Sequence, residues 1–121
     1  MVKIILGFFS YTLILFSQPY SPSLKLQQNC FVCHQTQEIP SELIYRRYLM
    51  KYSTHSAIKT TLLAYLQNPK QKNSIMPKQF FIKFPFKEKS DLNITELEQS
   101  IDDYLDYFDV TKKLILPRNH R

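Results

Sequence analysis

The chain has 121 residues, of which 44% are hydrophobic and 14% aromatic, and its formal net charge at pH 7 is +6. This length suits one small domain, and this apolar content predicts a folded chain rather than a disordered one. The basic residues form no recognised nucleic-acid-binding motif, so we expect no nucleic-acid partner.

Residues 1–20 are predicted to be a secretory signal or an N-terminal anchor. Met1, Val2 and Lys3 form a short positive start, and residues 4–16 are mostly apolar. This run is shorter than the roughly 20 residues of a membrane span and fits the apolar part of a secretory signal. Residues 17–21 contain small side chains but no A-x-A cleavage pattern, so an uncleaved anchor and a buried helix stay open as alternatives.

An exported chain is therefore expected, in the periplasm or anchored to the outer face of the inner membrane by an uncleaved leader. Residues 21–121 would then form the single folded domain. A domain of this size is only marginally stable by its own core and often depends on a cofactor or another covalent link.

Both cysteines of the chain lie in the run Cys30-Phe31-Val32-Cys33-His34. The pattern C-x-x-C-H is the signal for covalent attachment of a c-type haem. Two thiols three positions apart on one helical turn can each add to one vinyl group of the same porphyrin, and the adjacent histidine can bind the iron. We therefore predict one covalently bound haem c, held by Cys30 and Cys33, with His34 as an axial ligand of the iron.

A pair of cysteines at this spacing can also form a redox-active disulfide or half of a zinc site. A thioredoxin-like redox site would lie in a βαβ pattern, and a zinc site would need two more ligands at comparable spacing; the sequence has neither. A disulfide and a chance match stay open as alternatives.

The rest of the chain predicts helices and no strands. A short helix over residues 21–29, with Pro22 in its first turn, would lead into the cysteines. Ser41 is the expected N-cap of a helix that continues to about residue 52, and Ser53-Thr54 the cap of another to about residue 67. In the first of these, Leu43, Ile44 and Tyr48 follow helical spacing; in the second, Ile58, Leu62, Tyr65 and Leu66 do. Met50 is expected to lie in the core.

Residues 69–92 are expected to form a loop, because they contain Pro69, Pro77, Pro85 and many lysines. Four phenylalanines also lie there, at positions 80, 81, 84 and 86, so the loop is expected to cover an apolar surface. The final helix is predicted to open with a capping box formed by Thr95 and Glu98. Its apolar face would consist of Leu97, Ile101, Leu105 and Phe108.

Charge is distributed unevenly along the chain. Lysines and arginines gather in the middle, between residues 46 and 89, whereas the acids concentrate in residues 91–109. A basic region of this kind would attract an acidic redox partner.

The order of these parts resembles a small class I c-type cytochrome. Cys30, Cys33 and His34 match the attachment residues of that family. Pro40 resembles the proline whose carbonyl accepts the other N–H of the ligating histidine, a bond that fixes the imidazole ring. Met76, followed by Pro77, resembles the methionine that supplies the second axial ligand. The resemblance implies an all-α, cytochrome c-like helical domain wrapped around one covalent haem, with the last helix packed across the first.

The chain also departs from the family. The first helix is short and lacks the family's glycine, and Ile39 stands where a glycine usually precedes the proline. The chain therefore resembles a divergent member of this family.

The second axial ligand decides the function that the resemblance implies. Met76 is the first candidate, because a thioether raises the potential and fills the site, as in an electron carrier. His55 and an open site are the alternatives, and Met76 could instead pack among the phenylalanines. We expect a carrier of single electrons between periplasmic or membrane-bound redox proteins, with no catalytic residues. A haem-based small-gas sensor and a haem subunit or anchor of a larger respiratory complex are the other candidates.

Overall fold

The computed structural model describes residues 21–36 and 39–114, so the predicted leader, residues 1–20, lies outside the described residues. The described residues are helical and include no strand, which confirms the all-α prediction. None of their helices is long and apolar enough to cross a membrane. The elements are α1 (Leu24–Leu26), η1 (Gln27–Phe31), α2 (Val32–Thr36), α3 (Ser41–Tyr52), α4 (His55–Gln67), η2 (Gln71–Asn73), α5 (Phe80–Lys83), α6 (Ile94–Phe108) and η3 (Val110–Lys113).

The first three elements follow one another without a break from Leu24 to Thr36. The side chain of Ser23 caps this segment by accepting a hydrogen bond from the backbone N–H of Leu26 at 3.2 Å. The segment therefore begins after Pro22, rather than at residue 21, and it continues through both cysteines. Its middle, η1, is a π-helical turn, in which the N–H of Val32 donates to the carbonyl of Gln27. Such turns occur often at functional sites.

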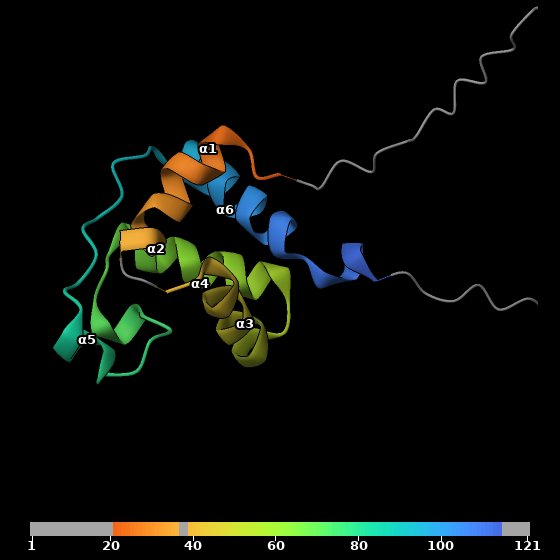
Figure 1. Cartoon of the computed structure of the whole chain (residues 1–121). Coiled ribbons are helices and arrows are strands. Elements are labelled where there is room, and N and C mark those ends of the chain that lie inside the picture. Colours follow the sequence, from red (N-terminus) through yellow and green to blue (C-terminus); the bar gives the residue numbers. More distant parts are fainter. Residues whose placement is uncertain (1–20, 37–38, 115–121) are drawn as a thin grey trace, which may run out of the picture.

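Helix α6 holds the core together, because it packs against α1, η1, α3 and α4. Figure 1 shows α1 and α6 next to each other, with α4 beside them. The face of α6 that meets these elements is buried and contains Leu97, Ile101, Tyr104, Leu105 and Phe108. The predicted apolar face is thus confirmed, and packing of the last helix against the first is present.

The capping box of α6 lies two residues earlier than predicted. Asn93, not Thr95, is the N-cap: its Oδ1 accepts a hydrogen bond from the N–H of Glu96 at 2.9 Å. In return, Oε2 of Glu96 accepts from the N–H of Asn93 at 3.4 Å. The prediction of Thr95 and Glu98 was wrong because Asn93-x-x-Glu96 fits the same pattern, and asparagine is at least as good an N-cap as threonine.

Helix α3 differs from the prediction at its start and in its buried face. Pro40, not Ser41, is the N-cap. The buried side chains are Tyr45 and Tyr48, whereas Met50 is 85% exposed, so placing Met50 in the core was wrong. Two residues further along a helix, the chain has turned about 200°, to the far side from Tyr48. The cap of α4 is as predicted: Oγ1 of Thr54 accepts from the N–H of Ala57 at 3.3 Å.

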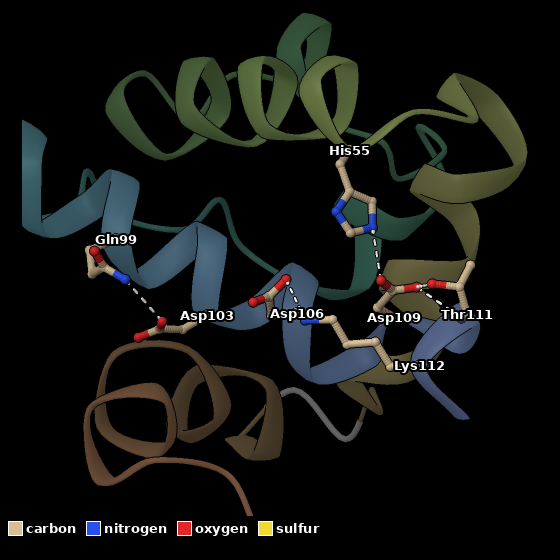
Figure 2. A network of polar contacts seen from close by, with 7 residues as sticks. All are labelled: His55, Gln99, Asp103, Asp106, Asp109, Thr111 and Lys112. Carbon is tan, nitrogen blue, oxygen red and sulfur yellow. Dashed lines mark hydrogen bonds and ion pairs between the residues drawn. The ribbon is translucent and has the colours of Figure 1, made fainter. Parts of the chain in front are cut away.

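Beyond α6, a polar network joins the end of this helix to the start of α4 (Figure 2). The carboxylate of Asp109 accepts hydrogen bonds from the N–H and the hydroxyl of Thr111, at 2.9 and 2.7 Å. Nε2 of His55 lies 4.0 Å from Oδ2 of the same carboxylate. The bonds from Thr111, with the nearby His55 and Lys112, lower the pKa of Asp109.

Candidate functional site

A single cavity contains Cys30, Cys33, His34 and Met76 in its walls. The cavity has a volume of about 100 Å³ and opens to solvent at its mouth. All the long helices and the segment between α4 and α6 contribute to the walls. The other lining residues are Asn29, Ile44, Tyr48, Leu62, Tyr65, Leu66, Ser74, Ile75, Phe80, Pro85, Lys87, Ser90, Leu92, Leu97, Ser100, Ile101 and Tyr104.

The two cysteines reach the cavity from adjoining elements of the first helical segment. Cys30 lies in η1 and Cys33 in α2, and both are half-buried thiols without a disulfide. The turn that carries Cys30 is tied to α6, because Nδ2 of Asn29 donates to Oγ of Ser100 at 3.2 Å. This bond, together with buried Leu26, fixes the side of the segment that faces the cavity.

The electrostatics of Cys30 differ from those of a redox-active thiol. Burial raises the pKa of Cys30 to about 11, against the opposing effect of the nearby charge of Lys87. The attacking thiol of a C-x-x-C redox site has a lowered pKa, because the thiolate is the nucleophile. The environment of Cys30 therefore disfavours the redox-disulfide alternative for this pair.

His34 follows in α2 and lines two depressions, the cavity on one side and a shallower pocket on the other. Its Nδ1 atom is buried and has no hydrogen-bond partner among the described residues. Burial lowers the pKa of His34, and the positive charge of Lys87 lowers it further. Both effects favour the neutral imidazole, which is the form that binds metals.

Pro40 lies with His34 in the wall of the shallower pocket and does not line the cavity. Its carbonyl accepts hydrogen bonds from the N–H groups of Leu43 and Ile44, at 3.0 and 3.4 Å. The hydrogen bond expected from His34 to this carbonyl is not formed in the structure, since Nδ1 is unpaired there. The carbonyl of Pro40 is thus already hydrogen-bonded within the first turn of α3.

Met76 enters the cavity from the segment between α4 and α6, which runs along the left side of the helices in Figure 1. The backbone N–H of Met76 donates to Oγ of Ser74 at 3.1 Å. Further along, the N–H of Ser90 donates to the carbonyl of Leu66 at 3.0 Å and fastens the segment to the end of α4. This segment was expected to be a loop, and it also contains η2 and α5.

The phenylalanines of this segment form stacked pairs. The rings of Phe80 and Phe84 stack with their centroids 4.7 Å apart, and those of Phe81 and Phe86 at 4.4 Å. Phe80 lines the cavity, whereas Phe86 is 49% exposed. The expectation that this segment covers an apolar surface therefore holds for Phe80 and not for Phe86.

Other wall residues were not predicted to belong to a site, among them Tyr104, Tyr65 and Lys87. Tyr104 follows Ile101 by three residues, so helical spacing alone would have found it. Its hydroxyl donates to the carbonyl of Ser41 at 2.7 Å, and burial raises its pKa. Tyr65 was predicted only as a core position. Lys87 had no signal in the sequence, since one lysine in a lysine-rich loop resembles any other.

His55, the alternative axial ligand, does not line the cavity, and its nearest acidic partner is Asp109. Among the described residues, no three His, Cys, Asp or Glu side chains are grouped so as to hold a metal ion by themselves. The cavity therefore combines two thiols, one imidazole and one thioether with apolar walls. No protein-family model, curated protein or solved structure gives a significant match to the chain.

Proposed function

We propose that this protein is a monohaem c-type cytochrome that carries single electrons between redox proteins. One observation carries the proposal: both cysteines, the adjacent histidine and Met76 line the same cavity, although Met76 is far from the others in sequence. The donor set fits the group, because thiols can bond to a porphyrin while imidazole and thioether can bind its iron.

Each residue would have a separate task. Cys30 and Cys33 would hold the porphyrin through thioethers, and His34 and Met76 would be the axial ligands. Haem supplies a one-electron redox centre when it is bound, and the protein sets its potential through ligand identity and burial. The apolar walls, including Leu97, would exclude water and thereby favour the less charged, reduced state.

The surface fits an acidic redox partner. The segment that carries Met76 also has exposed lysines at positions 70, 72, 78, 83 and 89. Two of the acids of α6 are already paired: Asp102 with Lys59 at 2.7 Å and Asp106 with Lys112 at 3.0 Å. The lysines near the cavity would then steer the partner in diffusional encounter.

The deciding experiment asks whether haem is covalently bound. The full chain, matured in an export-competent host that has haem-attachment machinery, should keep its haem in denaturing electrophoresis. The Cys30→Ser/Cys33→Ser double variant is the matched control and should lose all of it. If the unaltered chain also loses all its haem under these conditions, the proposed function is wrong.

A further inference from the structure

Lys87 is the only side chain with a fixed charge among the described residues that line the cavity. It is half-buried, and its Nζ donates to the backbone carbonyl of Glu88 at 3.1 Å. No described carboxylate lies within ion-pair distance of Nζ. By contrast, Arg46 has Glu42 as a partner and Lys59 has Asp102.

A charged side chain in the wall of an apolar cavity is stabilised when an anion pairs with it. Lysine has a long, flexible side chain and would normally turn its charge out to solvent. The side chain of Lys87 nevertheless lines the cavity, and its charge acts on both His34 and Cys30. A molecule that fits against the apolar walls and carries an anion at its edge could therefore pair with Lys87.

We propose that Nζ of Lys87 forms an ion pair with a propionate carboxylate of the bound haem. This inference rests on the proposed function. A haem combines the two required properties, since its ring is flat and apolar while its two propionates are anionic. Lys87 would be a positioning residue: it fixes the edge of the porphyrin and offsets the propionate charge, and it takes no part in binding the iron.

The test compares neutral and charged replacements in the haem-loaded protein. Lys87→Met and Lys87→Gln remove the charge, Lys87→Arg keeps it, and Lys89→Met removes an exposed lysine two positions away. We expect both neutral variants to shift the propionate bending bands of the resonance Raman spectrum and to lower the midpoint potential. Lys87→Arg should restore both readouts towards the original values, and Lys89→Met should leave the propionate bands unchanged.

Two results would overturn the inference. In the first, the neutral variants retain covalent haem and their propionate bands do not move. In the second, the axial-ligand bands change and the propionate bands do not, which would make Lys87 an iron ligand. Both outcomes are distinct from failure of the proposed function, in which the unaltered chain carries no covalent haem at all.

Discussion

At the scale of single residues, burial shifts the pKa values of Cys30 and His34 in opposite directions. It raises that of the thiol to about 11 and lowers that of the imidazole, so both side chains are favoured in their neutral forms. A neutral imidazole can bind a metal, whereas a thiol held protonated is a poor nucleophile for disulfide exchange. The site is therefore better suited to holding a group than to thiol redox chemistry.

The two methionines beyond the first residue show how far residue type alone can mislead. Met50 and Met76 are chemically identical, yet Met50 is 85% exposed on α3 and Met76 is half-buried in the cavity wall. Only Met76 can contact a group bound in the cavity. Met50 is therefore a matched control for Met76.

The first prediction at this scale concerns Met76→Ala in the haem-loaded protein. Loss of a thioether ligand should abolish the weak far-red absorption typical of the resembled family, lower the potential and open the iron to carbon monoxide. Absorption spectra with and without carbon monoxide measure this, and Met50→Ala should leave them unchanged. An unchanged Met76→Ala spectrum that still excludes carbon monoxide would mean that the ligand is another residue.

At the scale of elements, the start of α6 depends on a reciprocal pair of hydrogen bonds. Asn93 and Glu96 each satisfy a backbone N–H of the other, at 2.9 and 3.4 Å. The first backbone N–H groups of a helix have no partner inside it, so such a cap stabilises the helix directly. Because α6 packs against four other elements, its first turn matters for the whole core.

We expect Asn93→Ala to lower the free energy of unfolding by about 1 kcal/mol. Thr95→Ala, two residues further on, should change it by less than about 0.5 kcal/mol, because Thr95 is exposed and caps nothing. Urea unfolding of the haem-loaded variants measures both. A larger loss in Thr95→Ala than in Asn93→Ala would place the helix start where the sequence alone had suggested.

At the scale of the whole molecule, the core and the cavity share residues. Among the residues that the structure describes, five of the ten buried apolar ones also line the cavity: Tyr48, Leu62, Leu97, Ile101 and Tyr104. A ligand that binds only the folded state adds to its stability, and more so where the core surrounds it. The folded domain and a bound group should therefore be strongly coupled.

Without haem, the chain is expected to keep much of its helix but to lose fixed packing. The Cys30→Ser/Cys33→Ser variant, purified free of haem, should show helical far-UV circular dichroism, a weak near-UV signal and a broad thermal transition. The haem-loaded protein is the reference and should unfold sharply at a higher temperature. A haem-free variant that unfolds as sharply and at the same temperature would show that the core is complete by itself.

The sequence by itself determined the all-α fold class and most of the helices of this protein. Apolar spacing located the buried face of α6, and proline, serine and threonine located the middle helices to within a few residues, since these signals act over one or two turns. The C-x-x-C-H run is likewise local, so Cys30, Cys33 and His34 could be grouped before any fold was known. Where two caps competed within three residues, as Asn93 and Thr95 did, the local signal was ambiguous.

Only the tertiary structure decided which distant residues meet. It brought Met76 into the cavity with the cysteines and left Met50 on the surface and His55 beside Asp109. In the tertiary structure the carbonyl of Pro40 accepts hydrogen bonds from the first turn of α3. Lys87, alone among the lysines of its segment, lies in the cavity wall. These outcomes depend on how α4, α6 and the segment between them pack, and residues far apart in sequence carry no local signal of that packing.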